Sequence, residues 1–316
     1  MKNILVTWWS WFIWSCLIKK LIEDNHIFCV TRKASSFDRI LDILGNKNLE
    51  TLYSDNINDI EKIFRDNHID YIIHLATTYK KAHEIEDIDA MINTNISLWT
   101  YLCQFAIKYW TKYFINTWTF FEYEHKKNRE NIISEDTTEL PYNLYASTKL
   151  SFHNVLKYYT NNNDFKAITL RLFSPYGPND NIKIIPLLIK NMIDNWDELK
   201  LSWWEQKLSF TYVDDICNAY IKSIEKIEDL EHNYEVFNIW SGETYSLNEI
   251  YEILCDISWK IWNVKFWAFP YAKNEIFYSQ CDYKKAKRLL WWEPKISIKD
   301  WLLLTYNSYL NDFWKN

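Results

Sequence analysis

The stretch MKNILVTWWSWFIWSCLIKKL, residues 1–21, decides how the rest of the chain is interpreted. Its apolar run from Asn3 to Thr7 is typical of a buried strand, and the amphipathic segment from Phe12 to Asp24 predicts a helix. Four tryptophans, at positions 8, 9, 11 and 14, stand where the strand turns into the helix. A tight turn of this kind ordinarily needs small residues, so its composition requires an explanation.

The whole chain has the same anomaly. Its 316 residues include 18 Trp and only 3 Gly, whereas glycine makes up about 7% of an average globular protein. Otherwise the composition is ordinary, with 48% hydrophobic and 25% charged residues and a net charge of -6. The acidic balance argues against a nucleic-acid partner, because such proteins usually present a basic surface.

The sequence favours a cytoplasmic protein without a membrane segment. It enters a strand directly, without the basic start and long apolar run of a secretion signal, and no later apolar stretch reaches the length of a membrane span. The six cysteines are scattered, with no C-x-x-C pair and no His at ligand spacing. We therefore expect neither a disulfide framework nor a metal site.

The first half of the chain alternates strands and helices. Apolar runs predict strands at 3–7, 26–31, 49–53, 70–76, 112–117 and 167–173, and amphipathic stretches predict helices at 12–24, 35–44, 57–67, 87–109 and 143–160. This alternation favours an α/β fold with a Rossmann-like, doubly wound parallel sheet. Beyond residue 173 the elements become shorter, up to an amphipathic tail at 297–310, which indicates a smaller second lobe.

Most tryptophans stand at predicted turns and helix ends. Trp110 follows a helix, Trp203 and Trp204 lie in a turn-rich segment, and Trp240 precedes Ser241. Glycine is the residue that supplies positive φ at such positions without steric cost. We therefore hypothesise that these letters are glycines, as would result if UGA codons that some bacterial lineages decode as glycine were translated as tryptophan.

The hypothesis exempts one tryptophan, Trp292. Replacing the other 17 would raise the glycine content from 3 to 20 residues, which is close to the usual fraction. The chain with these 17 replacements is called the glycine form below. The alternative is a genuinely Trp-rich protein that stacks sugars or bases on its indoles.

With glycine at these positions, the sequence resembles the extended short-chain dehydrogenase/reductase family, the NAD(P)-dependent nucleotide-sugar epimerases and dehydratases. Six stretches carry the resemblance in the family's order: TWWSWFIW at 7–14, HLATT at 74–78, YASTK at 145–149, RLFSPYGP at 171–178, YVDD at 212–215 and LLWWEP at 289–294. The resemblance implies an NAD(P)-binding domain at 1–173. It also implies a mainly substrate-binding lobe at 174–316, with some segments returning to the first domain.

The resemblance implies a set of cofactor contacts. In the family, the turn that corresponds to Trp8, Trp11, Phe12, Ile13 and Trp14 lets the helix N-terminus approach the cofactor pyrophosphate. Further cofactor positions match Asp55, Asn56, Ala76, Thr77, Thr78 and Asn95, together with Tyr145 and Lys149.

Two basic residues bear on the choice of cofactor. Arg32 and Lys33 end the second strand, where NAD-preferring members of the family usually carry an acid. Their charges suit a 2′-phosphate, which favours NADP(H), with NAD(H) as the alternative. Two solvated basic residues after a strand would have no such role.

Tyr145 and Lys149 form the strongest chemical pair. Four residues apart on one predicted helix, they share a face. A lysine ammonium near the phenol lowers the pKa of the tyrosine, so that Tyr145 can exchange a proton with a sugar hydroxyl. The resemblance adds Thr117 as the residue that hydrogen-bonds the same sugar oxygen.

Departures from the family pattern bear on the substrate. After Thr117, the dehydratases of the family carry an Asp-Glu pair where this chain has Trp118 and Thr119, so dehydration is not expected. Ser174 stands where many members have an Asn, and Lys207 adjoins the position of a diphosphate-binding Arg. The substrate-binding candidates are Thr78, Thr119, Ser174 and Lys207.

The run NTWTFFEY, with LYASTK and RLFSPYG, looks most like the branch of CDP-abequose and CDP-paratose synthases, which reduce a 4-keto sugar with NADPH. We expect a 4-ketoreductase acting on a nucleotide 4-keto-6-deoxyhexose, as in surface-polysaccharide synthesis. The alternatives are a UDP-hexose 4-epimerase and, from another class, a non-catalytic NADP-sensing or sugar-binding protein. Family members often form homodimers through the helices that correspond to 87–109 and 143–160.

Overall fold

A computed structural model describes most of the chain. The described residues are 1–7, 12–33, 35, 37–125, 132–178, 180, 183–194, 198–202, 206–259, 264–270 and 276–313. Trp8 and Trp11 of the predicted phosphate turn lie outside the described residues.

Seven strands form one parallel sheet in the order β11-β6-β5-β4-β1-β2-β3. Their bounds are β1 (Asn3–Thr7), β2 (His26–Thr31), β3 (Leu49–Tyr53), β4 (Tyr71–His74), β5 (Tyr113–Thr119), β6 (Lys166–Leu172) and β11 (Tyr234–Ile239). The six predicted strands are confirmed, with ends that differ by three residues at most. The sheet has the Rossmann strand order, extended at one edge by β11.

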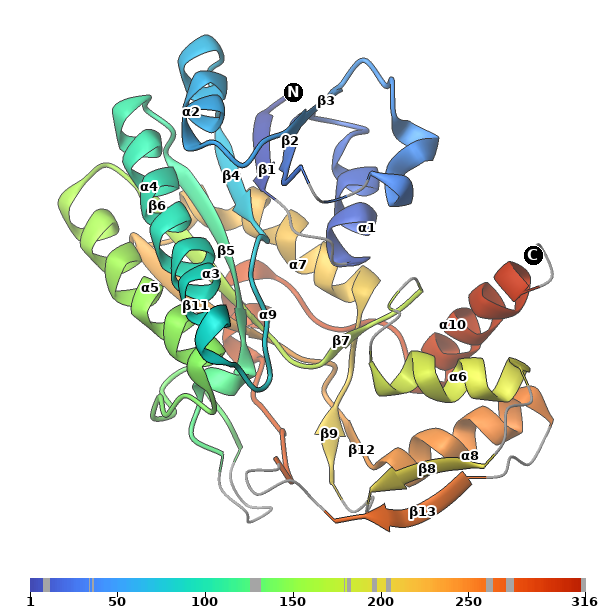
Figure 1. Cartoon of the computed structure of the whole chain (residues 1–316). Coiled ribbons are helices and arrows are strands. Elements are labelled where there is room, and N and C mark those ends of the chain that lie inside the picture. The colour runs from blue at the N-terminus through green and yellow to red at the C-terminus, as the bar shows by residue number, and fades with distance from the viewer. Residues whose placement is uncertain are drawn as a thin grey trace.

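Helices cover both faces of this sheet (Figure 1). One face carries α2 (Ile57–Asp66), α4 (Leu98–Lys108) and α5 (Leu144–Asn162), whose apolar residues share a buried cluster. The other face carries α1 (Phe12–Leu21), α7 (Val213–Lys226) and α9 (Lys284–Leu290), which share a second cluster. The doubly wound α/β architecture is therefore confirmed.

Two predicted helices differ from expectation. The segment predicted as a helix at 35–44 contains only a 3₁₀ helix, η1 (Asp38–Ile43), which is kinked at Ile40, where φ is -127°. Only Ile40 of its six residues is buried, so little packing is available to stabilise a regular α-helix. The helix predicted at 87–109 is divided into α3 (Ile88–Ile92), a π-helical turn η3 (Asn93–Ser97) and α4. Such turns are frequent at functional sites.

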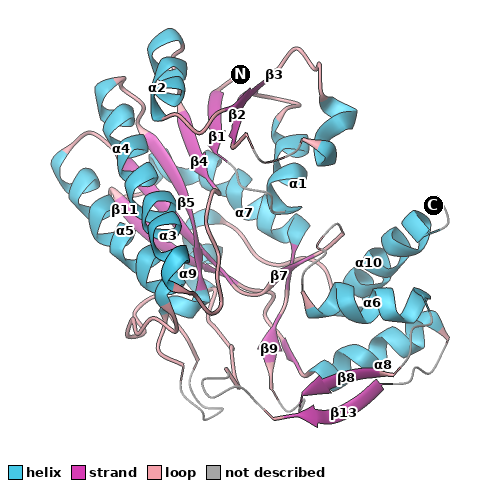
Figure 2. Ribbon diagram, in the orientation of Figure 1, coloured by secondary structure: helices cyan, strands magenta, loops and turns pink. Residues whose placement is uncertain are grey.

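A smaller group of elements lies below the carboxyl edge of the sheet (Figure 2). It contains α6 (Ile184–Asp194), α8 (Leu247–Ser258) and α10 (Ile298–Phe313), with the parallel pair β8 (Leu199–Ser202) and β13 (Val264–Phe269). Short pairs connect it to the sheet: β7 (Pro175–Tyr176) with β10 (Thr211–Tyr212), and β9 (Leu208–Ser209) with β12 (Thr244–Tyr245).

Within the described residues, no helix is long and apolar enough to cross a membrane. The order of the strands reverses between β1 and β4, and ligands of doubly wound folds bind at such a reversal, beyond the carboxyl ends of the strands. The search for a functional site therefore begins where β1, β4 and β5 end.

Candidate active site

The first turn of α5 carries the predicted catalytic pair. Asn143 caps this helix by accepting a hydrogen bond of 2.9 Å from the backbone N–H of Ala146. The cap places Tyr145 and Lys149 one above the other on the buried side, 5% and 1% exposed. Lys149 Nζ donates a hydrogen bond of 3.1 Å to the carbonyl oxygen of Thr117 on β5. The helix start and the end of β5 are thereby joined.

The surroundings of Tyr145 are largely apolar. Its ring meets the ring of Tyr79 edge to face, with centroids 4.9 Å apart. Burial raises the pKa of the Tyr145 phenol above its ordinary value, while a hydrogen bond with the Thr77 side chain opposes the rise. Burial also holds the pKa of Lys149 well below its ordinary value, against the charge of Glu122.

The pKa of Tyr145 is therefore raised, and not lowered by Lys149 as expected. The reason is that desolvation dominates: it raises the pKa of the phenol and disfavours the charged ammonium that would lower it.

The side chain of Asn95 connects the end of β4 with α5. Its carbonyl accepts hydrogen bonds from the Thr77 hydroxyl (3.0 Å) and the Thr78 backbone N–H (2.8 Å). Its amide donates to the Thr78 carbonyl and to the Thr148 hydroxyl, both at 3.0 Å. Asn95 is fully buried in the π-helical turn η3. These four bonds fix the segment Ala76–Thr78 beside Tyr145.

Thr117 contacts the Tyr145–Lys149 pair through its backbone and not through its hydroxyl. Its backbone carbonyl receives the Lys149 hydrogen bond, but its hydroxyl lies 2.5 Å from the Tyr220 hydroxyl on α7. Thr119, two residues later, caps the short helix η4 (Phe120–Glu122) by accepting from the Phe121 N–H at 3.3 Å. The hydroxyl of Thr117 would have to leave Tyr220 to reach a substrate.

A buried contact between Glu122 and Arg171, below the site, was not predicted. Glu122 is fully buried, and one of its carboxylate oxygens lies 3.4 Å from Nε of Arg171 on β6. Arg171 also pairs with Glu139, and its guanidinium lies 4.3 Å from the centroid of the Tyr123 ring. Burial raises the pKa of Glu122 to about 8, against the charges of Arg171 and Lys149. An Arg within the apolar run AITLRLF was the available sequence signal, because a buried charge needs a partner.

The carboxyl ends of β2 and β3 hold the residues predicted to contact the adenosine half of a cofactor. Arg32 bonds the Thr94 hydroxyl. Burial lowers the Arg32 pKa to about 10, against the charge of nearby Asp55. Lys33 and Asp55 are exposed, and Asn56 is occupied as the N-cap of α2. On α1, the side chains of Phe12, Ile13 and Trp14 are buried in the core.

These donors fit a nicotinamide dinucleotide. The Arg32 guanidinium and the Asp55 carboxylate lie at the ends of β2 and β3. The hydroxyl of Thr77, the amide of Asn95 and the phenol of Tyr145 lie beyond the end of β4. Such cofactors bind beyond the carboxyl ends of these strands. No cluster of metal-ligating side chains occurs in the described part of the chain.

Comparison with known proteins resolves the family. A model of the NAD dependent epimerase/dehydratase family matches residues 4–239. The chain belongs to this family. It is 29% identical over 293 residues to CDP-abequose synthase of Salmonella muenchen, covering 92% of each chain, and 24% identical to dTDP-4-dehydro-6-deoxyglucose reductase of Escherichia coli, covering 80% and 81%.

Solved structures agree with this assignment. UDP-glucuronic acid 4-epimerase from Bacillus cereus, in complex with UDP-glucuronic acid and NAD, matches with a TM-score of 0.86 and 26% identity. The match covers 98% of this chain and 99% of that one. The protein is therefore an epimerase/dehydratase-family enzyme of the nucleotide-sugar type, with an NAD(P)-dependent oxidoreductase or isomerase activity.

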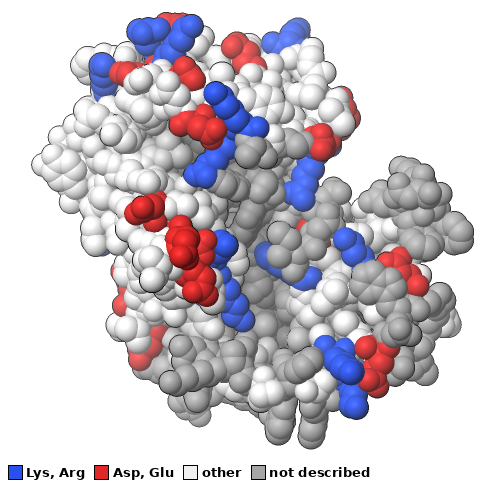
Figure 3. All heavy atoms as spheres, viewed as in Figure 1, with Lys and Arg blue, Asp and Glu red and all other residues white. Residues whose placement is uncertain are grey.

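The predicted substrate-binding residues of this epimerase/dehydratase are brought together less completely than the predicted cofactor-binding residues. Ser174 has a φ of 35°, a conformation that Asn adopts more readily than Ser, and Asn is the residue expected there from the family. Lys207 forms an ion pair with Glu249 on α8. Thr78 lies beside the Tyr145 region through its bonds to Asn95. On the face shown in Figure 3, basic side chains lie on both sides of a hollow in the surface.

Proposed function

We propose that this enzyme is an NADPH-dependent 4-ketoreductase acting on a nucleotide-activated 4-keto-6-deoxyhexose. The observation that carries the proposal is the buried Tyr145–Lys149 pair tied to the end of β5, where no acidic pair follows Thr117. The site thus has a proton donor for a carbonyl oxygen. It lacks, after Thr117, the acidic pair that an elimination would use. Two matched relatives, named for CDP-abequose synthesis and for reduction of a dTDP-4-dehydro-6-deoxy sugar, support the same chemistry.

In the proposed reaction, the sugar C4 carbonyl becomes a secondary alcohol. The bound cofactor supplies the two electrons and the hydrogen that C4 gains. Tyr145 donates its phenolic proton to the carbonyl oxygen, and Lys149, charged once a polar ligand fills the site, stabilises the resulting phenolate. The phenolate then recovers its proton from solvent. Thr117 turns its hydroxyl from Tyr220 toward the same oxygen and holds the carbonyl in place.

Arg32 supports the preference for NADP(H). Arg32 directly follows β2, and its guanidinium lies near Thr94 and Asp55. From there it can reach the ribose end of a cofactor. The neighbouring Lys33 is exposed and can add a second positive charge. A 2′-phosphate is recognised by such a pair of cations.

The proposed substrate contacts are Thr78, Thr119, Ser174 and Lys207. Lys207 contributes to binding of the diphosphate only if its pair with Glu249 opens, because that carboxylate already neutralises it. We also propose that residues 1–173 bind the cofactor and residues 174–316 mainly the sugar nucleotide, with β11 and α7 returning to the first unit, and that the enzyme works in the cytoplasm.

We further propose that the enzyme is a homodimer that pairs α4 and α5 of two subunits. Both helices present large aromatic side chains to solvent, with Tyr101 51% and Tyr158 63% exposed. Light scattering after size-exclusion chromatography tests this assembly, and a mass of one chain would contradict it.

The second candidate is a UDP-hexose 4-epimerase, favoured by the similarity to UDP-glucuronic acid 4-epimerase. A single experiment separates the two. The glycine form is given NADPH with a CDP-4-keto-6-deoxyhexose, and separately a UDP-hexose with NAD. Stoichiometric loss of NADPH absorbance supports the reductase, whereas interconversion of UDP-hexoses without net cofactor change supports the epimerase. A Tyr145→Phe control must lose either activity.

A further inference from the structure

We infer that the native polypeptide carries glycine at the helix ends written here as Trp110, Trp259 and Trp291, and a true tryptophan at Trp292. This inference is independent of the proposed function, because it rests on backbone conformation and on the surroundings of the indoles. It gives the glycine hypothesis, and its exemption of Trp292, a basis in individual conformations and contacts.

The first observation is the backbone at three helix ends. Among the described residues, four that are not glycine have positive φ, and three of them are Trp110 (66°), Trp259 (56°) and Trp291 (57°). All three glycines of the chain also have positive φ, between 86° and 157°. A side chain with a Cβ is strained in this region, and glycine is the usual residue there.

These three positions also follow the geometry of helix termination. Trp110 follows Tyr109, the C-cap of α4, and the next residue, Thr111, donates its N–H to the carbonyl of Ala106 at 2.9 Å. This is the hydrogen bond that closes a Schellman motif around a left-handed residue, most often glycine. Trp259 and Trp291 are the left-handed caps of α8 and α9.

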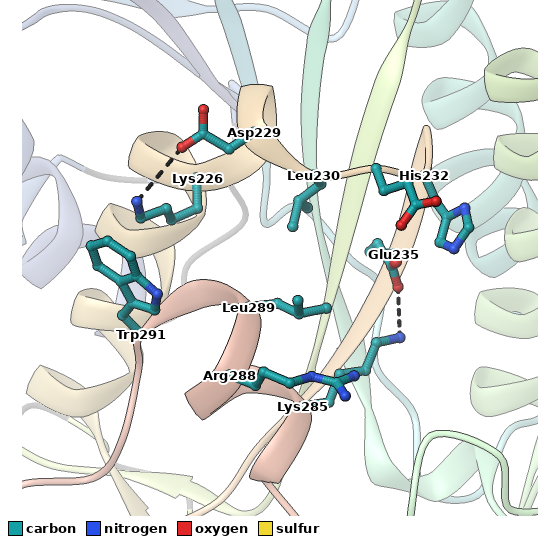
Figure 4. Close-up of a pocket in the computed structure, with 10 residues that line it drawn as sticks. Lys226, Asp229, Leu230, His232, Glu235, Lys285, Arg288, Leu289 and Trp291 are labelled. Carbon is teal, nitrogen blue, oxygen red and sulfur yellow. Dashed lines mark ion pairs between the residues drawn. The ribbon is translucent and has the colours of Figure 1, made fainter.

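The indoles at these ends have little packing to justify them. Trp110, Trp259 and Trp291 are 81%, 93% and 70% exposed. Lys226 lies 3.5 Å from the centroid of the Trp291 ring, which is a favourable contact. Figure 4 shows, however, that the same lysine faces Asp229, with which it forms an ion pair of 3.6 Å. Lys226 therefore keeps a partner when the indole is absent.

The neighbouring residue, Trp292, is the opposite case. It is 2% exposed, and its indole N–H donates a hydrogen bond of 2.9 Å to the carbonyl of Asp215. Buried tryptophans usually find such an acceptor. The buried indoles of Trp99, Trp118 and Trp240 have no acceptor among the described residues. Trp292 thus has an acceptor placed for its indole N–H, and within the described part of the chain these three do not.

Trp301 shows what happens when an indole occupies a space too small for it. Its ring centroid lies 3.1 Å from that of Tyr212, whereas aromatic pairs prefer about 4.5–7 Å. Overpacking of this kind destabilises a core. Replacing Trp301 with glycine would relieve this overpacking.

The direct test is peptide sequencing by mass spectrometry of the protein purified from the cells that carry its gene. We expect glycine at positions 110, 259 and 291 and tryptophan at position 292. Tryptophan at any of the first three positions overturns the inference, as does glycine at position 292.

A second test needs only recombinant protein. We expect Trp110→Gly, Trp259→Gly and Trp291→Gly each to raise the urea midpoint of the chain as written, and Trp292→Gly to lower it. The matched controls Trp110→Ala, Trp259→Ala and Trp291→Ala remove the indole but keep the strained Cβ, so their midpoints should stay below those of the glycine variants. Glycine variants that do not exceed their alanine controls contradict the inference.

Discussion

Lys149 Nζ, on a side chain that is 1% exposed, lies 3.1 Å from the carbonyl oxygen of Thr117, and this contact joins the first turns of α5 to the end of β5. Because Thr117 accepts through its backbone, the position of the ammonium does not depend on the threonine side chain. The hydroxyl of Thr117 bonds Tyr220 instead, and its role can be tested separately from that of the backbone.

Tyr145→Phe should remove the proton donor while leaving the packing intact. We expect kcat of the glycine form to fall by about 10²–10⁴, the range of general acid–base catalysis. The urea midpoint should fall only slightly, because the ring keeps its contact with Tyr79 and loses only the hydrogen bond with Thr77. Steady-state kinetics and denaturation measured on the same preparation check both statements. Turnover equal to that of the parent enzyme would exclude Tyr145 as the acid.

Thr117→Val tests the hydroxyl apart from the backbone. The variant keeps the carbonyl that Lys149 contacts but loses the group that faces Tyr220. We expect a lower kcat with cofactor binding unchanged, measured by fluorescence titration with NADPH. Tyr220→Phe is the matched control, since it breaks the same hydrogen bond from the other side. Equal loss of kcat in both variants would assign the hydroxyl a structural role only.

Arg32→Ala should change the choice of cofactor. Loss of the guanidinium is expected to raise KM for NADPH by at least tenfold and to leave KM for NADH nearly unchanged, since a charge-assisted phosphate contact is worth about 1.5–3 kcal/mol. Kinetics with the two cofactors measure the ratio directly. Lys19→Ala serves as a control, because Lys19 is a half-exposed lysine that pairs with Asp42. An equal rise in KM for both cofactors would argue against recognition of a 2′-phosphate.

Asn95→Ala should destabilise the fold through the end of β4. The change removes four hydrogen bonds and leaves buried Thr77 and Thr148 groups without this partner. Each unsatisfied buried group costs about 1–3 kcal/mol, so a clear fall in the urea midpoint is expected. Asn93→Ala is the control, because Asn93 lies on the same π-helical turn but is exposed. Similar midpoints for the two variants would remove Asn95 from its proposed structural role.

Glu122 should make stability depend on pH. Its pKa is raised from 4.5 to about 8 by burial, so between these values the unfolded chain loses a proton that the folded chain keeps. This contribution is complete below pH 4.5 and is lost as the pH rises toward 8, by at most about 1.4 kcal/mol per pH unit. The stability of the parent relative to Glu122→Gln should therefore fall across this range.

Urea denaturation of both proteins from pH 5 to 8 measures this difference. The comparison cancels the contributions of His125 and His153, whose pKa values are lowered to about 4 and about 3 by burial and which act in the opposite direction. A difference that stays constant with pH would show that Glu122 keeps its charge in the fold.

The sheet was predictable because each of its first six strands is a short apolar run between turns. β11 was not predicted. Its run YEVFNI lies in the second half of the chain, where strand-like and helix-like segments no longer alternate regularly. The segment at 35–44 has helix-like spacing, but with one buried residue it forms only a kinked 3₁₀ helix. In both segments the secondary structure depends on tertiary packing rather than on the sequence pattern.

The proposed catalytic pair could be predicted because Tyr145 and Lys149 are four residues apart on one helix. The buried partners Glu122 and Arg171 were not, since they come from different elements and only the fold brings them together. The same holds for Thr117 on β5 and Tyr220 on α7, whose hydroxyls meet between the sheet and the helix. Local spacing reveals pairs within an element, whereas contacts between distant elements require the three-dimensional structure.

The most direct measurement is the absorbance of NADPH during incubation of the glycine form with a CDP-4-keto-6-deoxyhexose. The proposed function predicts one NADPH consumed for each sugar reduced, with no consumption by Tyr145→Phe. Unchanged NADPH in the presence of folded enzyme that interconverts UDP-hexoses would contradict it.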